Sequence, residues 1–320
     1  MKSVLSDRTI LVTGGAGFIG SHLVEALVAE NDVRVLDNFE TGDPNTVPDE
    51  ATLLEGDVCD QETVRDACSG VDVVFHQAAI VSVERSVRNP RETDRTNLSG
   101  TLEILEAART ERTRVVLASS AAVYGHPTEL PVCEKTRLVP TSPYGVQKLA
   151  VDRYARVYAE LYDLPIVPLR YFNVYGPRQR GPYSGVISTF LRQARANEPI
   201  TIEGDGMQSR DFVHVDDVVR ANLLAATTEE YGMAYNVGTG TRTTVMELAE
   251  TVRRIVGSDS TIRHCEPREG DVRHSVADVT RARSNLEFTP SIGLETGLRT
   301  LVEGDGRGIL ECEPSESTDR

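Results

Sequence analysis

The sequence predicts an α/β fold in which a doubly wound parallel sheet is joined to a smaller C-terminal α/β domain. Short apolar runs alternate with helical patterns through the first half of the 320-residue chain, which is typical of βαβ units. A glycine-rich turn follows the first of these runs, as it does between strand and helix in many such folds. After residue 171, prolines and glycines divide the chain into shorter segments, which indicates a second part richer in loops.

Six mostly apolar runs are expected to be the strands of the sheet: residues 9–13, 32–36, 52–55, 71–76, 114–118 and 166–170. Helical patterns between them predict helices over residues 20–30, 61–67, 98–110 and 144–162. In the second part, a helix is expected over 244–256 and a short strand around 261–263.

Composition excludes several classes of protein. Hydrophobic residues make up 39% of the chain and charged residues 26%, so wholesale disorder and a disulfide scaffold do not fit. The 49 acidic and 34 basic residues give a formal net charge of −15, whose field repels nucleic acid and anionic membranes. Only Lys2, Lys135 and Lys148 are lysines, so nearly every cation is an arginine. Adaptation to a high-salt cytoplasm and an ordinary acidic protein both remain open as explanations.

The cysteines indicate a reducing compartment. Five are present, an odd number, and they show no CxxC or other metal-ligand spacing, so we expect free thiols and no metal. No apolar run approaches the roughly 18 residues that cross a bilayer, and the N-terminus lacks the pattern of a signal peptide. The expected location is therefore the cytoplasm.

The segment TGGAGFIGS at residues 13–21 is typical of a phosphate-binding loop. It lies between the first predicted strand and the first predicted helix, where backbone N–H groups at a helix start meet a diphosphate. Its glycines fit GxGxxG through Gly15, Gly17 and Gly20, or GxxGxxG through Gly14, Gly17 and Gly20. Both patterns predict a dinucleotide.

Asp37 indicates which dinucleotide is bound. It ends the second predicted strand, where a carboxylate accepts hydrogen bonds from a ribose 2′-hydroxyl and repels a 2′-phosphate. Asn38 follows, with no arginine close behind to pair with a phosphate. The sequence therefore favours NAD over NADP.

Tyr144 and Lys148 are candidate catalytic residues. They lie four apart at the start of a predicted helix and so project from one face. A nearby ammonium and a cationic nicotinamide favour the phenolate of a tyrosine, whose ordinary pKa is about 10. Ser119 and Ser120 end the strand VVLASS at the sheet edge where ligands bind, and a serine there is placed to relay a proton to Tyr144.

These motifs together resemble the extended short-chain dehydrogenase/reductase family, and within it the nucleotide-sugar epimerases related to UDP-glucose 4-epimerase. The similarity covers about residues 8–302 and includes TGGAGFIG, GDV, HQAA, TNLSGT, SSAAVYG, YGVQK, RYFNVYGPR, GDGMQSRDFVHVDDV, YNVGTG and REGDVRHS in the order of the family. The resemblance implies oxidation and re-reduction at carbon 4 of a UDP-sugar with tightly held NAD and no net redox change. Tyr144 would take the 4-hydroxyl proton with help from Ser120, and Lys148 would bind the nicotinamide ribose.

The resemblance also implies the residues that contact each ligand. The expected cofactor contacts are Gly14, Gly17, Phe18, Ile19, Gly20, Asp37, Asn38, Asp57, Val58, Gln77, Ala78, Ala79, Asn97, Tyr144, Lys148 and Phe172. The expected substrate contacts are Ser82, Ser120, Asn173, Arg210, Arg268, Asp271 and Ser275, with the two arginines on the diphosphate.

Domains and assembly follow from the same resemblance. Residues 1–171, with 212–237 returning to them, are expected to form a Rossmann-type NAD-binding domain. Residues 172–211 and 238–302 are expected to bind substrate, and residues 303–320 to be a frayed tail. The helices at 98–110 and 144–162 resemble the pair through which this family forms homodimers.

Departures from the family pattern bear on the reaction and the sugar. Relatives that dehydrate or decarboxylate the sugar carry an acid just after the catalytic serine or threonine, whereas this chain has Ala121 and Ala122. We therefore expect an epimerase. The enzymatic alternative is a 4,6-dehydratase or decarboxylase, and the non-enzymatic alternative is an NAD-sensing scaffold. Val81 replaces a lysine of the glucose/galactose enzymes, and the small Ser275 leaves room for a 2-acetamido group, so N-acetylhexosamines join glucose as expected substrates.

Overall fold

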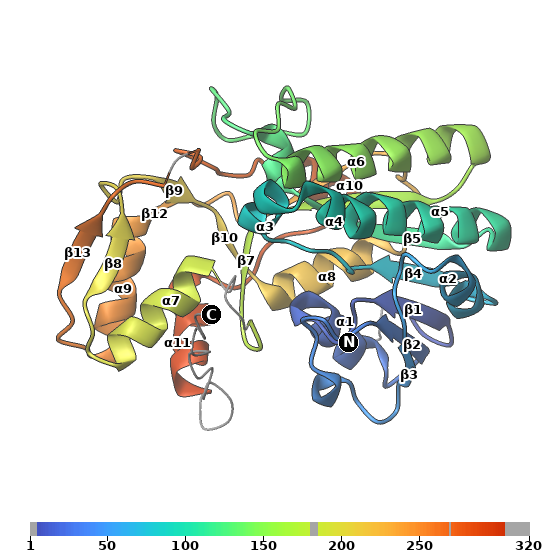
Figure 1. Ribbon diagram of the computed structural model, residues 1–320, viewed down its shortest axis with the longest axis horizontal. Helices are drawn as coiled ribbons and strands as arrows, with labels where there is room; N and C mark the ends of the chain where they lie inside the picture. The colour runs from blue at the N-terminus through green and yellow to red at the C-terminus, as the bar shows by residue number, and fades with distance from the viewer. Residues whose placement is uncertain (1–4, 180–184, 269, 305–320) are drawn as a thin grey trace, which may run out of the picture.

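The computed structural model describes residues 5–179, 185–268 and 270–304, and its centre is a seven-stranded parallel sheet (Figure 1). The strands are β1 (Thr9–Thr13), β2 (Asp32–Asp37), β3 (Thr52–Glu55), β4 (Val73–His76), β5 (Arg114–Ser120), β6 (Ile166–Tyr171) and β11 (Tyr235–Val237). Their order across the sheet is β11-β6-β5-β4-β1-β2-β3. The chain therefore winds outward in one direction from β1 and then in the other from β4, which confirms the predicted doubly wound fold.

All six predicted strands are present, and their ends differ from the prediction by at most two residues. The largest differences are at β4, which begins at Val73, and at β5, which continues to Ser120. The start of β4 is shifted because the N–H of Val71 donates to Cys68 O in the turn after the preceding helix. The seventh strand, β11, lies within the segment that was predicted to return to the first domain.

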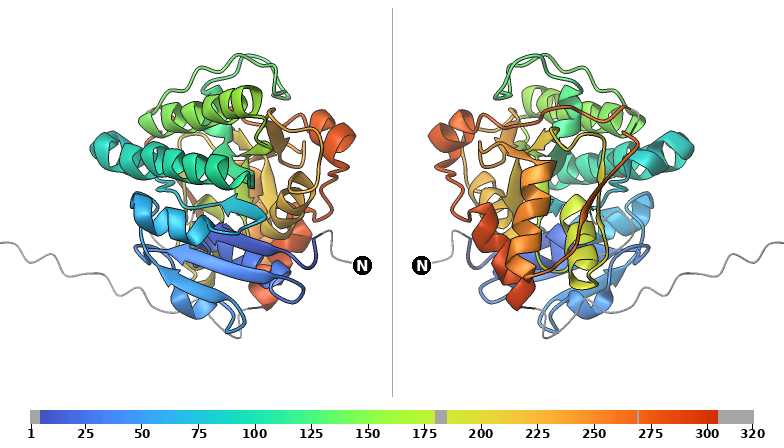
Figure 2. Two further views of the ribbon diagram at one scale, coloured as in Figure 1. Left: turned by 90° about the vertical axis from the view of Figure 1, so that its right-hand side faces the viewer. Right: turned by 90° about the vertical axis from the view of Figure 1, so that its left-hand side faces the viewer.

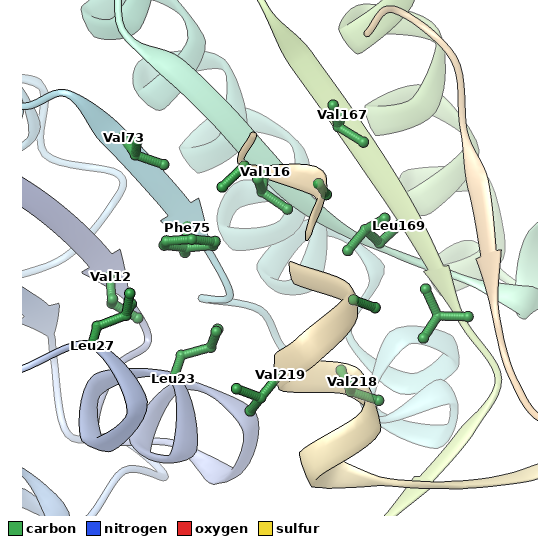
Figure 3. Packing of buried hydrophobic residues seen from close by; sticks show 14 of the residues in the cluster. Val12, Leu23, Leu27, Val73, Phe75, Val116, Val167, Leu169, Val218 and Val219 are labelled. Atoms are coloured by element: carbon green, nitrogen blue, oxygen red, sulfur yellow. The ribbon is translucent and has the colours of Figure 1, made fainter. Parts of the chain in front are cut away.

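Helices cover both faces of the sheet. One face carries α1 (Phe18–Leu27), α8 (Val215–Ala225) and α10 (Thr280–Leu286), and the other carries α2 (Gln61–Cys68), α5 (Gly100–Glu111) and α6 (Pro143–Tyr162). Figure 3 shows the first of these two cores, where Leu23 and Leu27 of α1 and Val218 of α8 pack against sheet residues such as Phe75. Because both faces are covered, β1 and β4 to β6 are almost wholly buried, as their apolar sequences require.

Two short helices and a π-helical turn connect β4 to α5. They are α3 (Val83–Arg88), α4 (Pro90–Asp94) and the turn Arg95–Ser99. The predicted helix 98–110 therefore begins as α5 at Gly100, after the wider turn. Asn97 lies within this π-helical turn and is fully buried, which matters for the site.

The second part of the chain forms a smaller lobe with its own apolar core, seen at the left of Figure 1 and facing the viewer in the right panel of Figure 2. Its helices are α7 (Gly185–Arg195), α9 (Val245–Val256) and α11 (Leu294–Glu303). Its strand pairs are β8 (Ile200–Glu203) with β13 (Ile262–Cys265), β9 (Ser209–Arg210) with β12 (Thr243–Thr244), and β7 (Asn173–Tyr175) with β10 (Phe212–His214). The helix and strand predicted here correspond to α9 and β13, whereas α7, α8, α10 and α11 were not anticipated. Of the tail predicted to fray, residues 305–320 lie outside the described chain.

Asp211 holds the two parts together. This buried carboxylate accepts hydrogen bonds from the backbone N–H groups of Thr239 (2.7 Å), Gly240 (2.8 Å) and Ala277 (3.1 Å). Thr239 and Gly240 follow sheet strand β11, while Asp211 lies between β9 and β10. The lobe that contains Arg210 is thereby fixed relative to the sheet edge.

Within the described ranges, the helices are too short or too polar to cross a membrane.

Candidate active site

The phosphate loop is built from glycines whose missing side chains allow a close backbone approach. Gly14 has φ +66°, and a Cβ on it would lie 2.7 Å from the N atom of Ala78. A Cβ on Gly20 would lie 2.1 Å from the Gly14 carbonyl oxygen. Gly17 is the N-cap of α1 and has no side chain to bind the first N–H groups of that helix. The open N-terminus and the narrow glycine cradle fit the diphosphate of a dinucleotide.

Asp37 supports the phosphate loop through its carboxylate. It is 8% exposed, and its carboxylate accepts hydrogen bonds from Ala16 N (3.0 Å) and Phe39 N (2.9 Å). Beside it, Asn38 Nδ2 lies 3.4 Å from Asp57 Oδ2. Burial works to raise the pKa of Asp57, but hydrogen bonds from Cys59 and Asn38 outweigh burial and lower it. Carboxylates at Asp37 and Asp57, on this side of the loop, favour hydroxyls over a phosphate.

Ser120, Tyr144 and Lys148 converge at the carboxyl edge of the sheet. Ser120 ends β5 and forms a side-chain hydrogen bond with Tyr144. The Nζ atom of Lys148 lies 6.0 Å from the centroid of the Tyr144 ring and donates to Ala118 O at 2.8 Å. Tyr144 and Lys148 are 8% and 4% exposed, so both reactive groups are shielded from water.

Burial has opposite effects on the ionisation of the two groups. It raises the pKa of Tyr144, an effect that the hydrogen bond with Ser120 offsets only in part. It lowers the pKa of Lys148 to about 8, although the nearby Asp152 carboxylate acts to raise it. Desolvation of the phenolate is therefore the largest of the effects on the pKa of Tyr144.

The start of α6, which carries Tyr144, is held by two serines. Ser142 is its N-cap and accepts a hydrogen bond from Gly145 N at 3.1 Å. Ser86, from α3, accepts one from the backbone N–H of Tyr144 itself, also at 3.1 Å. The two hydroxyls satisfy N–H groups that a helix start leaves free, and they fix the depth at which Tyr144 enters the site.

A buried chain of hydrogen bonds links the phosphate loop to the π-helical turn. Thr13 Oγ1 lies 2.7 Å from Nδ1 of His76, and Nε2 of His76 lies 3.0 Å from Thr101 Oγ1. The Thr101 hydroxyl donates to the Asn97 carbonyl at 2.7 Å, so His76 must donate through Nε2 and accept through Nδ1. Burial, followed by the charge of Lys148, lowers the pKa of His76 to about 3, which keeps the ring neutral as this pattern requires.

Asn97 continues this chain into the catalytic helix. Its side chain binds the backbone N (2.8 Å) and O (3.0 Å) of Ile80 and Oε1 of Gln147 (2.9 Å). Gln147 directly precedes Lys148 and donates to Thr93 Oγ1 at 3.0 Å. The phosphate loop, the turn after β4 and helix α6 are thus held in one register.

An arginine joins segments on the two sides of the phosphate loop. Arg85 on α3 pairs with Glu40, which follows β2, and with Glu92 on α4. Because β1 lies between β2 and β4 in the sheet, the Arg85–Glu40 pair spans the carboxyl end of β1, where the phosphate loop lies. These two carboxylates raise the pKa of Arg85, so its charge is permanent.

Five of the seven residues predicted to bind substrate lie on the small lobe beside this edge, whereas Ser82 and Ser120 belong to the sheet part. Arg210 Nη2 pairs with Asp271 Oδ1 at 2.6 Å, and the backbone N–H of Ser275 donates to Ser209 O at 3.0 Å, so these residues are brought together. Asn173, in β7, is exposed, and its N–H donates to Asp211 O. Arg268 lies further out, with 69% of its side chain exposed, and pairs with Glu203.

Several predicted residues also have structural roles. The Ser82 hydroxyl accepts from Arg85 N at 3.0 Å and caps α3, and the Gln77 side chain binds Tyr171 and Asn222. Ala78 borders Gly14, and Val58 and Phe172 are 5% exposed. Phe18 and Ile19 open α1, and Ala79 follows β4.

The sequence did not reveal the roles of Arg85, Ser86 and Gln147, because their partners lie far away in the chain. His76 offered a signal that was overlooked: it is a polar residue at the end of the buried strand VVFH.

A phosphate loop at the switch point of a doubly wound sheet, next to a serine, tyrosine and lysine, defines a nicotinamide-dependent enzyme of the extended short-chain dehydrogenase/reductase class. The model of the NAD dependent epimerase/dehydratase family matches residues 10–238. The chain belongs to this family.

Individual relatives cover nearly the whole chain. The putative UDP-glucose 4-epimerase of Methanocaldococcus jannaschii is 42% identical over 299 residues, which are 92% of this chain and 97% of the relative. A crystal structure of the Thermotoga maritima UDP-glucose 4-epimerase with UDP-glucose has a TM-score of 0.89 at 40% identity, covering 92% of this chain and 97% of that one. The UDP-N-acetylglucosamine 4-epimerase of Methanobrevibacter ruminantium M1, in complex with UDP-N-acetylmuramic acid, has a TM-score of 0.90 at 35% identity, covering 93% and 98%.

The glycine cradle yields a first prediction, which compares Gly14→Ala with Gly257→Ala. Both glycines have positive φ, +66° and +70°, but a Cβ on Gly257 meets nothing within 4 Å. Gly257→Ala should therefore show only the left-handed backbone strain, about 1 kcal/mol of unfolding free energy. Gly14→Ala should lose more stability, because its Cβ collides with Ala78, and should no longer retain NAD. Urea unfolding and the NAD content per chain after gel filtration measure the two effects. Equal NAD content in both variants would contradict the role of the cradle.

Proposed function

We propose that this chain is an NAD-dependent 4-epimerase of UDP-sugars, acting on the UDP-glucose/UDP-galactose pair and on the corresponding N-acetylhexosamine pair. The observation that carries the proposal is the convergence of Ser120, Tyr144 and Lys148 beside the phosphate loop. The named activities of its relatives support the same reaction.

In this mechanism Tyr144 acts as the base. Its oxygen takes the proton of the sugar 4-hydroxyl, with Ser120 relaying the proton through the hydrogen bond that the two side chains share. NAD, held by the glycine cradle, would supply the hydride acceptor and donor for carbon 4, and inversion would follow from return of the hydride to the opposite face of the sugar. The Lys148 ammonium favours the phenolate and holds the nicotinamide ribose. Tyr144 then returns its proton to the new hydroxyl, so that no net redox change occurs.

The binding residues are proposed as the sequence predicted them. NAD would be held by the glycine cradle, by Phe18 and Ile19 at the start of α1, by Asp37 and Asn38, and by the other predicted cofactor contacts. The sugar nucleotide would displace the carboxylates that now pair with Arg210 and Arg268, because a diphosphate offers each guanidinium a bidentate partner.

We assign the two tasks to two parts of the chain. Residues 1–171 and 212–237 would hold NAD, and residues 172–211 and 238–302 would hold the sugar nucleotide. The shared Asp211 contacts would keep both ligands in register.

Dehydration or decarboxylation is disfavoured by the two residues after Ser120. Ala121 and Ala122 supply no proton donor for the elimination of a sugar hydroxyl. The family as a whole contains both epimerases and dehydratases, so the products must be distinguished directly.

The activity prediction compares Tyr144→Phe with Tyr154→Phe, a matched change at an exposed tyrosine of the same helix. Wild type and Tyr154→Phe should interconvert UDP-glucose with UDP-galactose and UDP-N-acetylglucosamine with UDP-N-acetylgalactosamine. Tyr144→Phe should lower kcat by about a thousandfold, because it removes the group that moves the proton. NMR of the sugar anomeric protons identifies the products, and NAD content and melting temperature control for folding. Wild-type activity in Tyr144→Phe, or a 4-keto-6-deoxy or decarboxylated product from wild type, would overturn the proposal.

We propose that the protein is a homodimer through α5 and α6, which lie side by side on the outside of the molecule (Figures 1 and 2). Val146, Tyr154, Val157 and Leu161 lie on one face of α6 and are 54%, 36%, 43% and 69% exposed. An apolar stripe on a long surface helix is typical of a helix-to-helix interface.

The dimer prediction uses a double variant, Val157→Arg with Leu161→Arg. Two charges on the stripe should prevent association, so light scattering should give the 35.0 kDa mass of one chain instead of twice that mass. Leu53→Arg, at an exposed apolar residue of edge strand β3, is the control and should remain dimeric. A mass that is the same for wild type and the double variant would refute this interface.

We infer that the acidic surface is an adaptation to a salt-rich cytoplasm. The formal charge of −15 destabilises the folded state by self-repulsion at low ionic strength, and salt screens that repulsion. The described cysteines are all free thiols, in keeping with a reducing compartment. Melting temperature and activity should therefore rise from dilute buffer to multimolar KCl. Full stability and activity in dilute buffer would contradict this inference.

A further inference from the structure

A cavity of about 750 Å³ lies apart from the proposed active site. It is bounded by the loop before α6, by the C-terminal half of α6, by the loop that precedes β11, and by Arg281 on α10. Ser120, Tyr144 and Lys148 do not line it. Its volume is within the range of small-molecule sites.

The charge of this cavity is opposite to that of the whole protein. Its lining contains six cationic side chains, Lys135, Arg137, Arg153, Arg156, Arg170 and Arg281, but only three acidic ones. The chain as a whole has an excess of acidic residues and a formal charge of −15. A local excess of positive charge in a concave site attracts small anions that the rest of the surface repels.

Three of these cations lack a protein partner. Arg170 pairs with Asp152, Arg281 with Glu134, and Arg156 with Glu160. In the part of the chain that the structure describes, the side chains of Lys135, Arg137 and Arg153 form no ion pair and no hydrogen bond. They are exposed at the rim, where each can meet an oxyanion.

The floor of the cavity presents a buried acceptor that lacks a donor. Asp152 Oδ2 binds Arg170 Nε at 2.6 Å, and the side chain is 4% exposed. Among the described residues, nothing donates to its other oxygen, Oδ1. A buried carboxylate oxygen without a donor is costly, and Asp152 is one of the residues that line the cavity, so a hydroxyl that enters beside it would relieve this cost.

The floor is also rigid. Arg170 Nη1 donates to the Tyr124 hydroxyl at 2.9 Å, and that hydroxyl donates to Asn236 Oδ1 at 2.6 Å. These groups belong to β6, to the turn after β5 and to β11, so sheet elements hold the floor in place. The Asp152–Arg170 pair is therefore held in place before a ligand arrives.

We propose that this cavity, with free arginines at its rim and the unsatisfied Asp152 oxygen on its floor, is a second ligand site for a small phosphorylated sugar or polyol. The phosphate contacts Arg137, Arg153 and Lys135, while a hydroxyl donates to Asp152 Oδ1. The site does not depend on the epimerase proposal, since it shares no residue with Ser120, Tyr144 and Lys148.

The test is calorimetric titration of the intact protein with glucose 6-phosphate, ribose 5-phosphate and glycerol 3-phosphate. Saturating UDP keeps these probes out of the sugar-nucleotide site, and inorganic phosphate and glucose are titrated for comparison. At least one phosphorylated probe should bind saturably and more tightly than inorganic phosphate, and glucose should not bind. Binding should weaken as KCl is added, because the rim charges are exposed.

The decisive variant is Arg137→Gln with Arg153→Gln, which removes two rim cations that hold nothing else in place. It should raise the Kd of the best probe by about tenfold or more, the loss expected when charge-assisted hydrogen bonds disappear. Arg112→Gln, at an exposed arginine after α5, is the matched control and should leave the Kd unchanged. No saturable binding of any probe, or an unchanged Kd in the rim variant, would overturn the site. Inorganic phosphate binding as tightly as every phosphorylated probe would overturn the role given to Asp152.

Discussion

The neutral ring of His76 holds together the parts of the molecule on which the site depends. It accepts a hydrogen bond from the Thr13 hydroxyl, next to the phosphate loop, and donates one to Thr101. The chain of hydrogen bonds then passes through Asn97 to Gln147 on the catalytic helix. Each member has its partners only while His76 stays uncharged, and burial ensures this by lowering its pKa to about 3. A second proton would convert Nδ1 into a donor facing a hydroxyl that already donates to it. The distance between the cradle and Tyr144 is therefore set by a polar network inside the sheet-helix core, and not by surface loops.

The proposed chemistry requires Tyr144 and Lys148 to be charged at positions where burial favours their neutral forms. Burial lowers the pKa of Lys148 to about 8, below its ordinary value of 10.5. The buried ammonium therefore lowers the stability of the fold fully below about pH 8, and this cost falls as the pH rises from about 8 to 10.5. Burial also raises the pKa of Tyr144, although a base must lose its proton. The site is thus strained electrostatically before any ligand binds, which is a common condition of catalytic residues.

The local features of the fold could be predicted from the sequence, whereas its long-range contacts could not. Strands such as β1 and β3 were expected at their observed bounds, because an apolar run between turn residues is a local signal. The convergence of Ser120, Tyr144 and Lys148 was expected because strand ends and helix starts meet at one edge of a doubly wound sheet. By contrast, Thr13 and His76 are 63 residues apart in the sequence, and Arg85 and Glu40 are 45 residues apart. No local sequence pattern predicts that the members of either pair are in contact. Helix α7 was missed because the glycines and prolines around it suggested loops.

The near absence of lysine has a consequence for the chemistry of the surface. Of the three lysines in the chain, Lys148 is 4% exposed, and within the described residues only Lys135 has an exposed amine. Reagents and enzymes that acylate amines, including acetyl transferases and ubiquitin-type ligases, thus meet one accessible lysine in this part of the chain. An arginine surface keeps its positive charges through such modification. Among the described residues, the one exposed amine, that of Lys135, lies at the rim of the arginine-rich cavity, so a fluorophore or crosslinker attached to it would report on that cavity.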